Sequence, residues 1–210
     1  MATIEKGILG GFSGKVGTVI GGNWKGIDYM RSKANKRSFT PSQKQLEQQL
    51  KFALIMRFLQ PMAGLLAISF SDFAIQKTGI NSAFSYAYEN AITGVFPDFT
   101  IDYSKALVSR GLLPNVLGPS VVSGAGSILT WSWTDNNSSD AQPTDQAILV
   151  AYCPEMKQAI YTTNGGNRSS LTADLNLLTF KSKVVETYIG FISADVRVAS
   201  SIFTGEVTVS

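Results

Sequence analysis

Short β-like runs separated by polar turn clusters fill residues 104–210, and this pattern constrains the fold more than any other feature. Such runs recur at a spacing of about ten residues, which is typical of an antiparallel β-sandwich. The run with Trp131 and Trp133 is expected to be an early strand with a tryptophan facing the core. The run at residues 188–191 is expected to be a late central strand. The eight runs are residues 106–109, 120–122, 127–134, 146–152, 158–162, 171–175, 184–193 and 201–209.

The cysteine content decides which kind of immunoglobulin-like sandwich is expected. Antibody domains bridge their two sheets with a pair of cysteines. This chain has only Cys153, which lies in an apolar run and is expected to be a small buried side chain. The sequence therefore favours a sandwich of the fibronectin type III kind.

The glycine-rich stretch at residues 7–26 contains eight glycines in twenty positions and one Gly-Lys step, which ends at Lys15. A phosphate-binding loop needs a further glycine and a hydroxyl residue at positions where this chain has Leu9 and Val16. Apolar residues alternate on both sides of a Gly-Gly-Asn turn signal at residues 21–23. The stretch therefore predicts a β-hairpin, not a nucleotide site.

A helix is expected after the basic segment that follows this hairpin. Thr40 suits the N-cap, Pro41 suits the first helical position, and Gln43 completes a capping box. The helix should end before Pro61. Its second half, residues 52–59, is apolar almost all round and is expected to be buried.

Two further elements are expected before the sandwich. The spacing of small and aromatic residues predicts a helix over residues 82–92, and alternation predicts a strand over residues 99–103. We expect an N-terminal hairpin and helical region, residues 1–103, followed by the sandwich domain, residues 104–210. The predicted fold class is therefore α+β.

The composition argues against an enzyme. The chain has no histidine, the commonest general base and transition-metal ligand, and its single cysteine cannot build a metal cluster. Ser-His-Asp and Cys-His catalysis are therefore excluded. Asp98 and Asp102 lie four residues apart in an extended segment and need not share a face, so we interpret them as a turn residue and an exposed strand residue. We expect no catalytic residue, no cofactor and no metal.

The polar loop at residues 135–140 resembles a calcium loop in composition. An EF-hand loop would have glycine in place of Asp140 and glutamate in place of Gln146. We therefore expect an ordinary solvated turn, and cation binding at this loop stays open.

Charge is divided unevenly along the chain. Residues 1–60 carry ten Lys and Arg against three Asp and Glu, and residues 61–210 carry eight against twelve. Only 16% of all residues are charged, so little charge has to be desolvated on contact with a partner. The basic front predicts contact with nucleic acid, an acidic surface or another copy of the chain. The predicted contact residues are Lys15, Trp24, Lys25, Tyr29, Arg31, Lys33, Lys36 and Arg37.

The location is inferred from two negative observations. The apolar stretch at residues 8–20 is broken by glycines and contains Lys15, unlike a secretory signal. The longest uncharged apolar run, residues 59–70, has twelve residues, whereas a membrane helix needs about 18 or more. We therefore expect no membrane span and a cytoplasmic location by default, with an extracellular or virion-associated location left open.

Motifs along the chain add a resemblance. They are GKVGTV at 14–19, WKGI at 24–27, FLQP at 58–61, NAITG at 90–94 and PDFTIDYSK at 97–105. Together with LTW at 129–131 and GF at 190–191, they resemble an uncharacterised family of bacterial proteins over nearly the whole chain. The resemblance implies an N-terminal hairpin, an amphipathic helix and a fibronectin-III-like sandwich. It brings no activity and no site residue.

Three classes of function remain. We favour a non-enzymatic structural protein that self-associates, its N-terminal segment docking on the sandwich of another copy to build a filament, a fibre or a virion or injection-apparatus component. The second class is a module that binds nucleic acid or carbohydrate through the basic N-terminal segment or the sandwich loops. An enzyme is the least favoured class.

Overall fold

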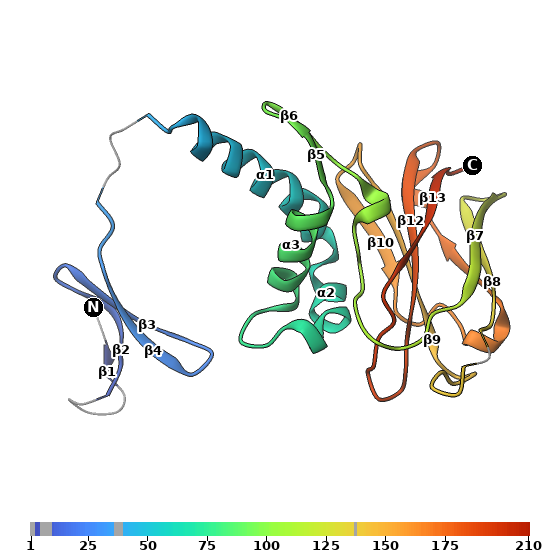
Figure 1. Ribbon diagram of the computed structural model, residues 1–210, viewed down its shortest axis with the longest axis horizontal. Coiled ribbons are helices and arrows are strands. Elements are labelled where there is room, and N and C mark those ends of the chain that lie inside the picture. Colours follow the sequence, from blue (N-terminus) through green and yellow to red (C-terminus); the bar gives the residue numbers. More distant parts are fainter. Residues whose placement is uncertain (1–2, 5–9, 36–39, 137) are drawn as a thin grey trace. The chain divides into compact units, whose positions relative to one another are not determined.

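The computed structural model describes residues 3–4, 10–35, 40–136 and 138–210. The chain divides into two compact units, unit 1 (Met1–Ser42) and unit 2 (Gln43–Ser210) (Figure 1). Unit 1 contains one antiparallel sheet in the order β1-β2-β3-β4. Its strands are β1 (Thr3–Ile4), β2 (Phe12–Val16), β3 (Val19–Trp24) and β4 (Ile27–Ser32).

The hairpin predicted for unit 1 is present, but its turns lie elsewhere. The prediction of a turn at residues 21–23 is wrong, because these residues lie inside β3. The chain turns at residues 17–18 and 25–26, and each turn contains positive φ angles, from 49° to 84°, which two-residue hairpin turns favour. Gly21 instead allows β3 to approach β2 closely, because a Cβ at this position would overlap the Phe12 carbonyl oxygen and ring.

Three helices open unit 2, and the first two lie end to end. The prediction that residues 52–59 are buried holds only for one face of the helix: Ile55, Phe58 and Leu59 have almost no exposed surface, whereas Phe52 is 55% exposed. The helices are α1 (Gln43–Leu59), α2 (Ala63–Ser69) and α3 (Gly79–Asn90), and a 3-10 turn (Gln60–Met62) joins the first two.

The predicted start of the first helix needs correction. Thr40 is not the N-cap, because α1 begins only at Gln43 and Ser42 is the residue directly before it. Serine suits that position as well as threonine does. A capping threonine does occur at α3, where the Thr78 hydroxyl accepts a hydrogen bond from the Asn81 amide at 3.3 Å.

The remainder of unit 2 consists of antiparallel strands joined by loops and short 3-10 turns (Figure 1). A hairpin of β5 (Ile92–Val95) and β6 (Asp98–Ile101) follows the helices. Two larger sheets have the orders β10-β9-β12-β13 and β11-β8-β7. Their strands are β7 (Leu117–Gly124), β8 (Ile128–Thr134), β9 (Gln146–Cys153), β10 (Gln158–Thr162), β11 (Thr172–Asn176), β12 (Val184–Ile192) and β13 (Ile202–Thr208).

One hydrophobic core contains side chains of both of these sheets, including Trp131 of β8, Cys153 of β9 and Phe191 of β12. The predictions of a core-facing tryptophan, a buried cysteine and a central late strand are therefore confirmed, since β12 pairs with both β9 and β13. The mixed α+β class with antiparallel sheets is confirmed as well.

A second hydrophobic core, which includes the helices and is called the helical core, lies on the opposite face of the β10-β9-β12-β13 sheet. Ile148, Val150 and Tyr188 of that sheet pack against side chains of α1, α2 and α3. The sequence predicts a division at residues 103 and 104, whereas these helices share a core with the sheet and the compact units divide between Ser42 and Gln43.

One predicted strand is absent. Residues 106–109 form no strand, because the Val108 and Ser109 amides donate to the Ser201 hydroxyl, at 3.0 and 3.3 Å, in place of a ladder of strand carbonyls. The segment is nonetheless fixed against the start of β13 by the Ser201 amide, which donates back to the Ser109 carbonyl.

Candidate interaction surfaces

The register of unit 1 brings several predicted contact residues to one face of its sheet. Lys15 of β2 pairs with Ile20 of β3, which pairs with Arg31 of β4. Residues directly opposite in antiparallel strands point to the same face, and every second residue along a strand does so too. Trp24 and Tyr29 have the same parity as Ile20 and Arg31, so they share this face.

This face, which we call the basic–aromatic face, consists of Lys15, Ile20, Trp24, Ile27, Tyr29 and Arg31. The Tyr29 ring lies across Gly22, where a Cβ would be 3.0 Å from the Tyr29 hydroxyl. Large apolar side chains on it are open to solvent, with Trp24 53% and Ile27 63% exposed. The face therefore combines cationic and aromatic groups on one side of the sheet.

The other predicted contact residues of unit 1 lie around this face or outside the described residues. Lys25 occupies the turn between β3 and β4. Lys33 follows β4, and its amide donates to the Thr18 carbonyl at 2.7 Å. Lys36 and Arg37 lie outside the described residues.

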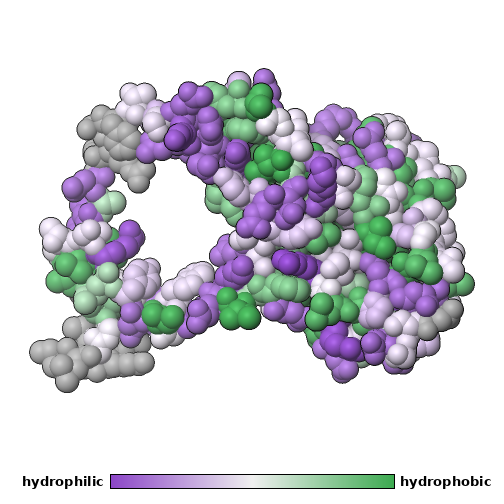
Figure 2. Space-filling view, viewed as in Figure 1, coloured by the Kyte–Doolittle hydropathy of each residue, from purple (hydrophilic) through white to green (hydrophobic). Residues whose placement is uncertain are grey.

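Unit 1 has no core of its own within its described residues. Across residues 10–35 the only buried residue is Gly21, which has no side chain. The face opposite the basic–aromatic face is also open, with Val16 57% and Met30 72% exposed. In Figure 2 the visible surface of unit 1 carries apolar as well as polar residues. A small sheet without a buried face of its own is marginally stable alone.

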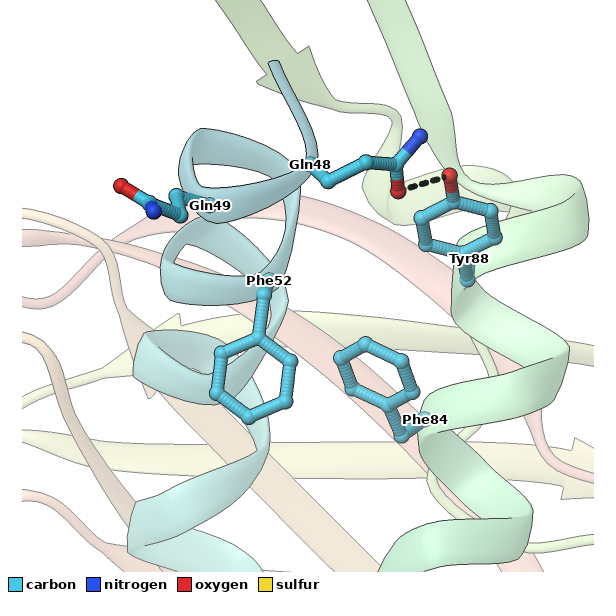
Figure 3. A pocket seen from close by; sticks show the side chains of 5 residues that line it. All are labelled: Gln48, Gln49, Phe52, Phe84 and Tyr88. Carbon is cyan, nitrogen blue, oxygen red and sulfur yellow. Dashed lines mark hydrogen bonds between the residues drawn. The ribbon is translucent and has the colours of Figure 1, made fainter. Parts of the chain in front are cut away.

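A second surface, which the sequence did not predict, lies between α1 and α3. Figure 3 shows Phe52 of α1 and Phe84 of α3 pointing toward one another across an open groove. Their ring centroids are 5.1 Å apart, and the Phe84 ring stacks on Tyr88 at 6.0 Å. The Tyr88 hydroxyl donates to the Gln48 side-chain carbonyl at 2.7 Å, which fixes one rim. This helical groove, lined by Gln48, Gln49, Phe52, Phe84 and Tyr88, has a volume of about 590 Å³.

The Gly-Lys step and the two aspartates of residues 98–102 lie in or directly beside strands. Lys15 lies in β2, and the chain continues in strands as far as Ser32, so no helix N-terminus follows the Gly-Lys step. Asp98 is not a turn residue but an exposed residue of β6, and Asp102 lies directly after that strand rather than in it. Asp102 accepts a hydrogen bond from the Ser104 hydroxyl and pairs with Lys105 at 2.9 Å. The Ser104 hydrogen bond, then Lys105, hold the pKa of Asp102 below its usual value.

The loop at residues 135–140 is described except for Asn137. Asp135 lies 3.7 Å from the buried Arg168 guanidinium, so this carboxylate is directed at a cation of the protein itself. Among the described residues no group of three or more acidic, cysteine or histidine side chains is arranged to hold a metal ion. The loop is thus a connection between strands that is tied to the sandwich by an ion pair.

Several ionisable groups are buried in or beside the helical core. The Tyr188 hydroxyl donates to the Tyr103 carbonyl at 2.9 Å, and burial raises the pKa of Tyr188 well above its ordinary value. Burial also raises the pKa of Tyr152, to about 12. Its ring packs edge-on against Phe58, with centroids 5.0 Å apart. Burial therefore keeps both phenols protonated at neutral pH.

One helical stretch of the described chain, Gln43–Ser69, is long and apolar enough to cross a membrane by length and composition alone. In unit 2 its side chains Phe58, Met62 and Leu66 are fully buried in the helical core. This packing explains why the stretch is apolar, and the absence of a membrane span stays a prediction.

Comparison with known proteins identifies a family that the sequence of this chain matches. No curated protein matches the chain. A family of unknown function, DUF6266, matches residues 11–205, which span most of unit 1 and nearly all of unit 2. The chain therefore belongs to the DUF6266 family, in agreement with the uncharacterised family that its motifs resemble.

Proposed function

We propose that this protein is a non-enzymatic structural protein that self-associates into a higher-order assembly, with unit 1 as its connector. One observation carries the proposal: unit 1 forms an ordered sheet in which no described side chain of residues 10–35 is buried. Ordering a backbone residue costs about 1–2 kcal/mol of conformational entropy, which buried apolar surface normally offsets. A second molecular surface is the natural source of that burial.

The exposed side chains of unit 1 suit such a contact. Trp24, Ile27 and Tyr29 lie on one face, and Val16 and Met30 lie on the other. Fully burying one large apolar side chain contributes about 1.5–3 kcal/mol, so a few of them stabilise an interface of ordinary strength. Because unit 1 would dock on a different part of the next copy, the contact is heterologous and can repeat into a ring or filament.

The sandwich supplies the larger body of the proposed structural protein, and we propose that it is of the fibronectin type III kind. Its first strand, β7, pairs with the second, β8, which also pairs with the fifth, β11, and its third, β9, pairs with the sixth, β12. This pairing is that of immunoglobulin-like sandwiches. The single cysteine excludes the disulfide that antibody domains have.

Sedimentation velocity of the full-length chain over a wide concentration range tests self-association. We expect a mass that increases with concentration, because a heterologous contact does not close at a dimer unless its geometry forces a ring. Removing residues 1–42 should leave a chain that stays monomeric, since both hydrophobic cores lie in unit 2. A full-length chain that remains monomeric at every concentration would refute the proposal.

A second candidate function, binding of single-stranded nucleic acid, is favoured by the register of unit 1. Lys15 and Arg31 flank Ile20 on the same face as Trp24 and Tyr29. Cationic side chains beside exposed aromatic rings are the groups that hold phosphates and stack on bases. Fluorescence anisotropy with labelled oligonucleotides at several salt concentrations tests this function. A steep loss of affinity with salt, reduced in Lys15→Gln and Arg31→Gln variants, would favour it over self-association.

A further inference from the structure

Two glutamates meet on the face of the β10-β9-β12-β13 sheet that carries the helical core. Glu186 of β12 lies directly opposite Glu206 of β13, and residues directly opposite in antiparallel strands point to the same face. Glu186 is only 7% exposed, whereas Glu206 is exposed. Among the described residues no Lys or Arg forms an ion pair with either carboxylate. Because like charges at opposed positions destabilise a sheet and burial disfavours a charge, this pair favours a state that holds a proton.

Tyrosines surround the buried carboxyl group. Tyr152 of β9 is directly opposite Glu186 on the side away from β13, and it belongs to the helical core. Tyr188 is the next residue of β12 in that core, and Tyr103 begins a 3-10 turn that ends at Lys105. Burial first, and then charges that include Glu186, raise the pKa of both of these phenols. The tyrosines therefore face the carboxyl group without supplying a cation.

The charged side chains beside these tyrosines do not neutralise the carboxyl group either. Lys105 is paired with Asp102 at 2.9 Å, and Arg57 of α1 acts on the Tyr152 phenol. Burial, and then the charge of the glutamate opposite, leave the pKa of Glu186 raised. The folded strand therefore binds this proton more tightly than an opened strand does, and protonation is coupled to structure.

The pair lies in an edge strand that is held on either side of it. β13 is the last strand of its sheet, and a bulge at Thr187 interrupts its pairing with β12. On one side of the pair the Thr187 hydroxyl donates to the Gly205 carbonyl at 2.6 Å. On the other side the Val209 amide donates to the Lys183 carbonyl at 2.9 Å. A loosening of residues 206–208 between these two contacts is therefore a local opening, not an unfolding of the sandwich.

We propose that Glu186 and Glu206 form a proton-operated latch on the end of β13: residues 206–208 stay paired with β12 while the two carboxyl groups hold a proton, and they loosen when both groups ionise. The latch lies within one copy of the chain, so it goes beyond the proposed assembly and does not depend on it. Acid closes the latch, because a group whose pKa is raised by folding stabilises the folded form below the ordinary glutamate pKa of about 4.3, and this stabilisation is lost as pH rises through the raised value.

Hydrogen exchange of the full chain between about pH 4 and about pH 8 tests the latch. After correction for the intrinsic pH dependence of amide exchange, we expect the opening constant at residues 206–208 to rise by about fivefold or more as pH rises. Amides of β8, in the other sheet, should keep their opening constants, because a local opening leaves them paired. Exchange at residues 206–208 that does not respond to pH would overturn the inference, and so would an equal change throughout unit 2.

Glutamine variants identify the groups, because glutamine has nearly the shape of glutamate and does not ionise. Glu186→Gln removes the buried carboxyl group and should abolish the pH dependence at residues 206–208. Glu206→Gln removes the opposing charge and should reduce that dependence. Glu89→Gln is the control, because Glu89 is exposed on α3, and it should leave the dependence unchanged. A pH dependence that survives in full in Glu186→Gln would refute the latch.

A titration of the wild-type chain covers the case in which a variant is poorly folded. The NMR shifts of the glutamate carboxyl carbons should show Glu186 titrating above about 4.3, in two linked steps with the glutamate opposite it. The opening constant at residues 206–208 should rise about tenfold for each unit by which the Glu186 pKa exceeds the ordinary value. A Glu186 carboxyl group that titrates at the ordinary value would overturn the inference.

Discussion

Replacing Arg168 by methionine should destabilise unit 2 strongly, because this side chain is fully buried yet charged. Its Nε lies 3.4 Å from the Asp145 carboxylate, and its Nη1 lies 3.7 Å from that of Asp135, both outside hydrogen-bond geometry. Its Nη2 donates to the Pro114 carbonyl at 2.7 Å. The guanidinium also lies 4.4 Å from the centre of the Phe191 ring. One side chain therefore links three loops to the sandwich core.

The magnitude follows from what the substitution leaves behind. Asp145 is only 2% exposed, so without Arg168 its carboxylate is a buried charge with no cation. Removing one partner of a buried ion pair costs about 3–5 kcal/mol. Methionine refills much of the volume, so a cavity adds little. For a unit of this size, each kcal/mol lowers the melting temperature by about 2–4 °C, which gives a decrease of about 6–20 °C.

Thermal and urea denaturation of the full chain, followed by circular dichroism, measure this loss. Arg197→Met is the control, because Arg197 is exposed and should change the free energy of unfolding by less than about 0.5 kcal/mol. Adding Asp145→Asn to Arg168→Met should recover part of the stability, because the uncompensated charge is then gone. If Arg168→Met unfolds within about 1 kcal/mol of the wild type, the buried pair does not act as argued.

Three further predictions concern the rest of the molecule. Burial, then the charge of Glu206, raises the pKa of Glu186; the stability that this side chain contributes should therefore be lost as pH rises above the ordinary glutamate pKa of about 4.3, and Glu186→Gln should gain on the wild type as pH rises in urea titrations. Gly79→Ala should lower the melting temperature although alanine favours helices by about 1 kcal/mol, because its Cβ would overlap the Leu66 carbonyl oxygen; an equal or higher melting temperature would contradict this. Removing residues 1–42 should leave the melting temperature of unit 2 unchanged, as differential scanning calorimetry can verify.

Local patterns predicted most strands of the two larger sheets of unit 2. The alternation around Trp131 and the apolar run ending at Cys153 identify strands whose side chains alternate between two cores or between a core and solvent. Such positions are visible in sequence because burial selects apolar residues with a period of two. The segment at residues 106–109 has the same pattern, but its amides bond to the Ser201 hydroxyl, a partner more than ninety residues away. Sequence periodicity carries no information about such a distant partner.

The candidate surfaces were predicted less completely, for related reasons. The basic and aromatic residues Lys15, Trp24, Tyr29 and Arg31 were identified from composition, but the turn was misplaced, and only the observed register places them on one face. The helical groove was missed because Phe52 lies in a helical segment that is apolar almost all round. In such a helix the pattern cannot distinguish the buried face from the exposed one.

The two faces of α1 have different roles: one packs into the core of unit 2, and the other is exposed in the helical groove. Ile55, Phe58 and Leu59 anchor the helix to the four-stranded sheet, whereas Phe52 projects into the groove with α3. A substitution on the anchoring face removes buried surface and unfolds unit 2. A substitution at Phe52 removes exposed surface and leaves the core in place. Unit 2 thus has an exposed aromatic groove, and unit 1 is a sheet that buries no side chain of residues 10–35. Exposed apolar surfaces of this kind are expected of a protein that binds other molecules through them.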